Sequence, residues 1–366
     1  MRRTLSRRLQ AQELLLLGSV SLHGLCPTDV SRKPARYRSL SSRSTNQALS
    51  HGDPRSYLAQ HVGECKLGPD WRIYSDFAHL LISQARELYR NDDFSLALQQ
   101  TVYALDATTI DLCLSLFPWA KFRKRKGAVK LHTLLDLRGN IPTVIIITHG
   151  LIHEVDILEQ LTFEAGAFYL MDRAYLDFPR LHRLHLASAF FVTRARKRFD
   201  CQRLYSLPVD RATGVMCDQI VTLANPVPRA GFPDKLRRIR YFDAQQERGL
   251  VFLTNNFTLP PLTVAQLYRS RWQVELFFKW IKQHLRIKKF YGTSENALKT
   301  QIWIAISVYV LVAIVKKQLK LEGSLYRILQ ILSVTLFEKT PILETLSLSE
   351  CEMELTTPCK QLILFH

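Results

Sequence analysis

Four residues in the last third of this 366-residue chain have the types and spacing of a catalytic surface. Tyr268, Arg271, Glu275 and Lys282 follow one another at steps of 3, 4 and 7 residues. In one continuous helix, at about 100° per residue, these steps place all four side chains within an arc of roughly 60°. A lone carboxylate beside two cations and a phenol has the chemistry of a metal ligand whose neighbours bind phosphates. We therefore predict a long helix over 262–287 that carries a catalytic acid.

Two further acids lie where carboxylates are costly. Asp106 lies within a strand-like apolar segment, and Asp172 ends another. Burial of a carboxylate in such a strand is unfavourable unless a cation or hydrogen bonds compensate. If the two strands are neighbours in a sheet, the aspartates converge and Glu275 can complete the site. The alternative is that each aspartate ends its strand or pairs with a local arginine, Arg173 or Arg194.

Three carboxylates without suitable nitrogen or sulfur ligands favour Mg²⁺ or Mn²⁺. A pair of such ions, about 4 Å apart, would activate a water or a 3′-hydroxyl and stabilise the leaving oxygen of an in-line phosphoryl displacement. No protein nucleophile is then required.

The elements that must position these acids form an α/β pattern. Helices are expected over 71–88, 154–161, 179–187 and 300–320, and strands over 101–110, 129–137, 141–148, 167–171 and 189–193. Short strand-like runs between 200 and 258 indicate a β-rich insertion before the long helix. We predict a five-stranded mixed sheet that is flanked by helices and interrupted by this insertion. Its order, β-β-β-α-β-α-β with the hairpin strands first, is that of the ribonuclease-H-like fold.

The same pattern divides the chain into five parts. The predicted parts are a basic, poorly ordered N-terminal segment (1–69), a first part of the catalytic core (70–199), the β-rich insertion (200–258), a second part of the core with the C-terminal helices (259–340) and a tail (341–366).

The charge balance favours a polyanionic partner. Lys and Arg number 50 and Asp and Glu 32, which gives a net charge of +18. A membrane-surface protein is the alternative class. One short run is predicted to contact DNA through Lys121, Arg123, Lys124, Arg125 and Lys126. Two more basic runs, 194–198 and 235–240, are weaker candidates, since any such run can be a solvated face.

Cysteine usage and hydropathy indicate a protein of a reducing compartment. The 7 cysteines are odd in number and contain no C-x-x-C pair, which argues against a disulfide framework or a thiolate zinc site. The apolar run 302–315 would span only about 21 Å as a helix, less than a hydrocarbon core of about 30 Å. We therefore expect a buried helix, no membrane partner, and a cytoplasmic, nucleoid-associated location in a bacterium.

These motifs resemble those of bacterial insertion-sequence transposases of the DDE, ribonuclease-H-like superfamily. The chain is similar to the IS-four family, whose signature Tyr-x2-Arg-x3-Glu-x6-Lys runs here from Tyr268 to Lys282. Upstream, Leu105-Asp106-Ala-Thr-Thr and Met171-Asp172-Arg-Ala-Tyr stand at appropriate distances. The resemblance covers roughly residues 70–340.

The resemblance implies a Mg- or Mn-dependent enzyme with two ions, held by Asp106, Asp172 and Glu275. It also implies that Tyr268, Arg271 and Lys282 contact the terminal phosphates of the element end, including the region of a flipped base. The implied partners are double-stranded DNA, at element ends and target, and a second copy of the chain in a synaptic complex. The implied reaction is nicking at the ends followed by 3′-hydroxyl attack, which is cut-and-paste transposition.

The chain departs from the family at its N-terminus. Residues 1–69 lack the helical pattern of the family's end-recognition domain, and the join at 64–70 is irregular. A catalytically inactive, truncated DNA-binding remnant is therefore an alternative, and a nuclease of the same fold acting on branched DNA is another. Ala174 stands where the family often has Gly. For Trp272 and Trp280 we expect packing in the core.

Overall fold

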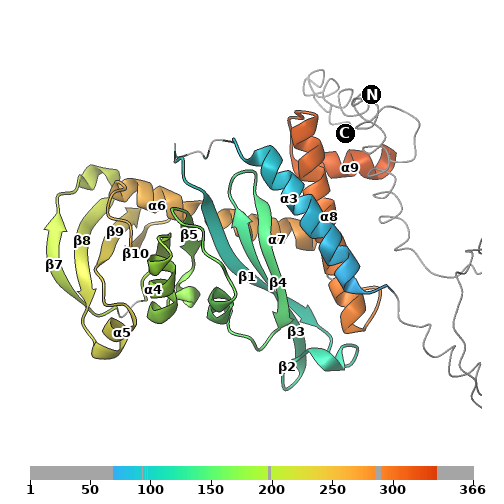
Figure 1. Ribbon diagram of the computed structural model, residues 1–366, viewed down its shortest axis with the longest axis horizontal. Helices are drawn as coiled ribbons and strands as arrows, with labels where there is room; N and C mark the ends of the chain where they lie inside the picture. The colour runs from blue at the N-terminus through green and yellow to red at the C-terminus, as the bar shows by residue number, and fades with distance from the viewer. Residues whose placement is uncertain are drawn as a thin grey trace, which may run out of the picture.

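The computed structural model describes residues 69–335 apart from 93, 95, 97, 197–198 and 285–289. The predicted N-terminal segment, except for its last residue, and the predicted tail lie outside the described residues. The rest is a mixed α/β structure in which helices pack on both faces of a long sheet (Figure 1).

The strands are β1 (Val102–Leu112), β2 (Lys121–Arg123), β3 (Lys126–Asp136), β4 (Ile141–His149), β5 (Phe168–Met171), β6 (Phe190–Arg194), β7 (Cys201–Leu207), β8 (Val215–Leu223), β9 (Leu236–Asp243) and β10 (Arg248–Thr254). The α-helices are α3 (Trp71–Tyr89), α4 (Phe178–Leu186), α5 (Pro226–Gly231), α6 (Pro261–Arg269), α7 (Trp272–His284), α8 (Glu295–Gln318) and α9 (Leu325–Thr335). Four 3₁₀ segments, η1 to η4, span Pro118–Ala120, Glu154–Glu159, Arg173–Tyr175 and Arg211–Thr213.

The first five predicted strands correspond to β1, β3, β4, β5 and β6, and they pair in the spatial order β4-β3-β1-β5-β6. β1 is antiparallel to β3 and parallel to β5. The β3–β4 hairpin turns through Gly139 and Asn140, with φ of 76° and 57°, the left-handed values that glycine and asparagine adopt most readily. The two aspartate-bearing strands are therefore neighbours, which is the condition on which convergence of the two aspartates depended.

The predicted insertion does not interrupt the sheet but lengthens it. β10 pairs with β6, and β9, β8 and β7 follow outward, so the sheet of the described residues has 10 strands instead of five. β7 was not predicted, because its side chains are mostly exposed and do not alternate between apolar and polar along the strand. The sheet thus runs unbroken from the β2–β3 hairpin to β7 (Figure 1).

Alternation along β1 fixes which face carries Asp106. Val102, Ala104 and Ile110 belong to the core cluster shared with α3, α7 and α8, whereas Tyr103 and Leu105 belong to the cluster on the opposite face. Because successive strand residues point to opposite faces, Asp106 shares the face of Ala104, under α7.

Helix α8 is longer than the apolar run 302–315 from which it was predicted. It spans 24 residues, and by length and apolar composition alone it could cross a membrane. Most of it is nevertheless buried against α3, α7 and α9, as a core helix is. The length argument for a buried helix was therefore wrong, although the burial itself is found. The predicted helix over 154–161 is the 3₁₀ segment η2.

A buried histidine beside β1 makes the fold acid-sensitive. Burial, assisted by Lys130, lowers the pKa of His132 from 6.5 to about 4. Between pH 6.5 and about 4, His132 binds a proton in the unfolded chain but not in the folded chain. Stability should therefore fall as the pH drops from 6.5 to about 4, by at most about 3 kcal/mol. His132→Leu should reduce that loss, measured by urea unfolding at pH 7 and pH 4.5. An equal loss in the variant would contradict this expectation.

Candidate active site

Asp106 and the backbone of Asp172 are brought to neighbouring positions by the parallel pairing of β1 and β5. Leu105 pairs with Met171, the residue before each aspartate, and adjacent strands lie about 5 Å apart. Asp172 follows the last residue of β5 and caps η3, and its backbone carbonyl accepts a hydrogen bond from Thr193. The parallel pairing of two central strands therefore places the two aspartates next to each other, Asp106 within β1 and Asp172 just past the end of β5.

The predicted long helix is broken between its first two signature residues, which corrects the prediction over 262–287. Tyr268 lies on α6, Arg271 lies in the junction, and Glu275 and Lys282 lie on α7. In the junction the backbone N–H of Arg271 donates to the Tyr268 carbonyl, three residues back, and Val274 likewise to Arg271. These bonds tighten the chain to a 3₁₀ turn between the two helices.

Arg271 connects two of the predicted acids. Its Nη1 donates to Asp106 Oδ2 and its Nη2 to Glu275 Oε1, each at 2.6 Å. The guanidinium side chain is only 13% exposed and lies 5.7 Å from the Tyr268 ring centroid. Glu275 thus faces Asp106 across one cation, as the prediction of a shared site requires.

Lys282, at the other end of the signature, donates hydrogen bonds to the strand that carries Asp106, β1. Its Nζ donates to Thr108 Oγ1 at 2.5 Å and to the Thr109 carbonyl at 3.0 Å. Thr108 follows Asp106 by two residues and therefore lies on the same face of β1. Thr108 was not predicted as a site residue, although its spacing of two residues from Asp106 could have indicated that it lies on the same face of the strand.

The electrostatics of the site favour a bound cation. Burial raises the pKa of Asp106 to about 6, against the opposing effect of Arg271 and with help from Glu275 and Glu154. Tyr175 is fully buried, and burial, with Asp106, Glu154 and Asp172 nearby, raises its pKa well above the ordinary value. Negative charge therefore accumulates in a poorly hydrated region, where a cation is stabilised most.

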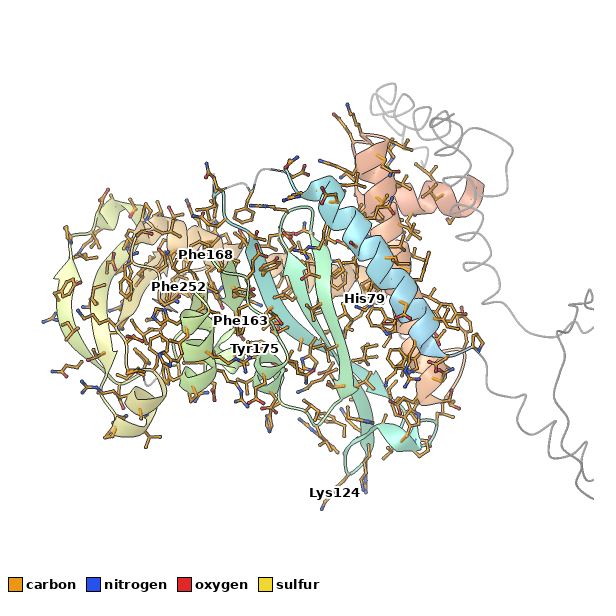
Figure 2. All side chains as sticks on the ribbon, viewed as in Figure 1. His79, Lys124, Phe163, Phe168, Tyr175 and Phe252 are labelled. Carbon is orange, nitrogen blue, oxygen red and sulfur yellow. The ribbon has the colours of Figure 1, made fainter. Side chains whose placement is uncertain are left out.

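Three buried polar atoms at this site have no hydrogen-bond partner. They are Tyr175 Oη, Tyr268 Oη and Arg271 Nε. Tyr175 was not predicted as a site residue, although it belongs to the Asp172-Arg-Ala-Tyr motif. Its interior position is visible in Figure 2. Unpaired buried donors are costly, and they are found where a ligand completes the site.

The donor set fits hard divalent cations. It consists of the carboxylates of Asp106, Asp172 and Glu275, with unpaired donors nearby to bond a ligand or its water. Among the described residues no three His, Cys, Asp or Glu side chains form a ready-made metal cluster. In this structure the Arg271 guanidinium contacts one oxygen of Asp106 and one of Glu275.

A hollow of about 910 Å³ adjoins the site, between β9–β10 and the α6–α7 junction. We call it the arginine hollow after the lining residues Arg194, Arg248, Tyr268, Arg269, Arg271 and Trp272. Trp272 is 56% exposed, so its predicted core packing is wrong. The helix break explains this, since Trp272 begins α7 at the rim of the hollow, whereas Trp280 is partly buried against the core.

The basic runs divide into exposed and buried cations. Lys121, Arg123, Lys124, Arg125 and Lys126 are all exposed on the β2–β3 hairpin. Figure 2 shows Lys124 at the tip of this hairpin, pointing away from the body of the protein. In the run 235–240, by contrast, Arg237 is 2% exposed and pairs with Asp218, which excludes it as a DNA contact.

Comparison with known proteins identifies the family. The family model described as "Transposase DDE domain" matches residues 97–311. The chain is 28% identical over 322 residues to a Sinorhizobium fredii protein named as a transposase, y4zB, covering 87% of this chain and 86% of that protein. It is 30% identical over 263 residues to the "Probable transposase for insertion sequence element IS5377" of Geobacillus stearothermophilus, covering 71% and 68%.

A Synechocystis protein named as the transposase of insertion sequence element IS4SA is 22% identical over 238 residues, covering 64% of this chain and 66% of that protein. Among solved structures, the piggyBac transposase synaptic complex with hairpin DNA matches with a TM-score of 0.40 and 11% identity, covering 71% of this chain and 55% of that chain. Because the family model spans more than half of the chain and the relatives match along most of it, this protein belongs to the DDE-domain transposases of bacterial insertion sequences, as its signature residues predicted.

Proposed function

We propose that this transposase cuts DNA at the ends of an insertion sequence and joins the released 3′ ends to target DNA. The observation that carries the proposal is the meeting of Asp106 and Glu275 on one guanidinium, beside the end of the neighbouring strand β5, where Asp172 lies. In this proposal a ribonuclease-H-like core, formed by β1 and β3–β6 with their helices, holds the three acids, and β7–β10 form the insertion.

Asp106, Asp172 and Glu275 would hold two Mg²⁺ or Mn²⁺ ions. Such ions activate the attacking oxygen and stabilise the leaving oxygen of a phosphodiester. Arg271 supplies a planar fork for a phosphate, and Lys282 keeps α7 in register with β1 through Thr108. The exposed Trp272 presents an aromatic face at the wall of the arginine hollow, suited to contact an unpaired base, and the buried Tyr268 lies in the same wall against Phe252 and Arg271.

The path of the DNA follows from the distribution of cations. The β2–β3 hairpin adjoins Leu112, six residues beyond Asp106 along β1, which is roughly 20 Å in an extended strand. Six base pairs of B-form DNA rise about 20 Å, since each rises 3.4 Å. A duplex placed on the acids can therefore reach the hairpin. Double-stranded element ends and target DNA are the proposed partners, with two copies of the chain in the synaptic complex, in a bacterial cytoplasm.

Removal of two hairpin charges should weaken DNA binding in a salt-dependent manner. For the double variant Lys124→Gln/Arg125→Gln, the slope of log K against log salt should become shallower by about 1.8, because each lost phosphate contact contributes about 0.9. The double variant Arg211→Gln/Arg229→Gln removes two exposed charges from the insertion and is the matched control. Fluorescence anisotropy over a range of salt concentrations measures both. Equal slopes in the two variants would exclude the hairpin from the DNA path.

The proposed activity is tested by incubating the protein with Mg²⁺ and a labelled duplex taken from the DNA that borders the coding sequence. Nicked and joined products are expected. Salt-sensitive binding without any cleavage would instead identify a DNA-binding remnant. Hydrolysis of branched DNA without joining would identify a nuclease.

A further inference from the structure

Arg271 binds one oxygen of each of two carboxylates that a divalent cation would need, Asp106 and Glu275. Its two Nη atoms donate to Asp106 and Glu275, each at 2.6 Å, and the three side chains are mostly buried. Because the guanidinium and a divalent cation are both positively charged, they repel each other when held between the same two carboxylates. The same guanidinium also lines the arginine hollow, where Arg194, Arg248 and Arg269 gather positive charge. Arg271 therefore stands between two alternative anionic partners, the acids and a phosphate.

We propose that Arg271 is an electrostatic latch that keeps Asp106 and Glu275 from divalent cations until a DNA phosphate in the arginine hollow withdraws its guanidinium. This inference rests on the proposed function. The latch compensates the two buried carboxylates in the absence of DNA, since both would otherwise lie close together without a counter-charge. When a phosphate binds Arg271, both carboxylates become available together. DNA binding and metal binding are thereby coupled, and each strengthens the other by the same factor.

The unpaired Nε of Arg271 supports two positions for this side chain. It is buried and has no hydrogen-bond partner, although both Nη atoms have carboxylate partners. A guanidinium has donors for more partners than the two acids provide. A phosphate in the hollow can accept from Nε and one Nη together, as a bidentate contact. When DNA binds, Arg271 thus gains a hydrogen bond from Nε to a phosphate as it gives up its hydrogen bonds to Asp106 and Glu275.

The test measures the affinity of the protein for Mn²⁺ through the electron paramagnetic resonance signal of free Mn²⁺. The affinity is measured without DNA and again with a duplex taken from the DNA that borders the coding sequence. In the wild-type protein the duplex should raise Mn²⁺ affinity by about tenfold or more. Arg271→Gln should bind Mn²⁺ at least about tenfold more tightly than the wild type without DNA, and the duplex should add little. Arg271→Lys, which can reach only one carboxylate, should be intermediate and retains the charge if the glutamine variant does not fold.

Arg269→Gln is the matched control. Arg269 lines the same hollow, is largely exposed, and pairs with Asp243 but with neither catalytic acid. Its loss should weaken DNA binding and leave Mn²⁺ affinity without DNA unchanged. Asp106→Asn, which removes a proposed ligand, should abolish the tight Mn²⁺ binding.

Two results overturn the latch, and they have different consequences. If Arg271→Gln binds Mn²⁺ as the wild type does, or if the duplex leaves wild-type Mn²⁺ affinity unchanged, while Asp106→Asn loses binding, the latch is wrong and the metal site stands. If Asp106→Asn binds Mn²⁺ as tightly as the wild type, the acids are not the ligands, and the latch fails together with the proposed function.

Discussion

Asp106→Asn is expected to reduce DNA strand cleavage by more than about 100-fold, the upper range for residues that only support a metal ligand. Asparagine keeps the shape of the side chain and its hydrogen bond from the Ala107 backbone N–H. It removes the charge on which a hard cation depends. Quantitative nicking of a labelled element-end duplex in Mg²⁺ measures the effect.

The same variant should be no less stable than the wild type. Burial raises the pKa of Asp106 from 3.8 to about 6, so the ionised form is disfavoured in the folded state. The folded chain binds the proton more tightly, and stability therefore decreases as the pH rises from about 4 to about 6. The full cost, at most about 3 kcal/mol, persists above pH 6. Asp106→Asn removes this cost at neutral pH, as urea unfolding should show.

Asp111→Asn provides the matched control for Asp106→Asn. Asp111 lies on the same strand, five positions away, and its side chain is exposed. Cleavage by this variant should remain close to that of the wild type. If Asp106→Asn cut DNA as well as Asp111→Asn does, Asp106 would not belong to the catalytic site.

The largest effect on stability is expected at the buried pair of Asp218 and Arg237. These side chains are 2% and 3% exposed, and Arg237 donates to both carboxylate oxygens at 2.9 and 2.7 Å. Arg237 also donates to the backbone carbonyls of Asn256 and Leu259, just before α6. Asp218→Ala leaves the cation buried without a counter-charge and should lower the free energy of unfolding by about 3–5 kcal/mol.

Two comparisons separate the charge effect from simple truncation. Glu87→Ala breaks the exposed pair of Glu87 and Arg90, and it should cost less than about 1 kcal/mol. Asp218→Leu/Arg237→Met removes both buried charges, so it should be more stable than Asp218→Ala alone. Thermal and urea unfolding provide the values. A loss below about 1 kcal/mol for Asp218→Ala would mean that water reaches Arg237.

This pair has a functional consequence through its position. It joins β8 and β9 to the segment that leads into α6, and α6 with β9–β10 forms a wall of the arginine hollow. The insertion is therefore fixed to the helices that carry the signature residues. Weakening the pair should loosen the hollow before it affects Asp106 on β1.

Much of the central fold could be predicted from sequence because its signals are local. The β-branched run of β4, the Gly139-Asn140 turn and the helical spacing of α3 each depend on neighbouring residues. The sequence indicated that Asp106 and Asp172 would converge if their strands were neighbours, and β1 does pair with β5. The spacing of the signature residues indicated the third acid, Glu275, which lies on α7.

The features that could not be predicted depend on distant contacts. No Pro or Gly marks the break at Ser270 and Arg271, where the side chain of Arg271 binds Asp106, 165 residues away. The burial of Arg237 depends on Asp218, on the neighbouring strand. An arginine in a basic run gives no local sign that its partner is a buried acid. The ion pairs that form in the folded structure therefore determine which Lys and Arg side chains remain available to contact DNA.

The most direct test of the proposed metal site is the anomalous scattering of Mn²⁺ in a crystal of the protein with its element-end duplex. Manganese peaks are expected within coordination distance of Asp106, Asp172 and Glu275, about 2.0–2.6 Å, with Arg271 turned to a phosphate. Manganese bound elsewhere, with Arg271 still holding Asp106 and Glu275 while DNA lies in the hollow, would contradict the account.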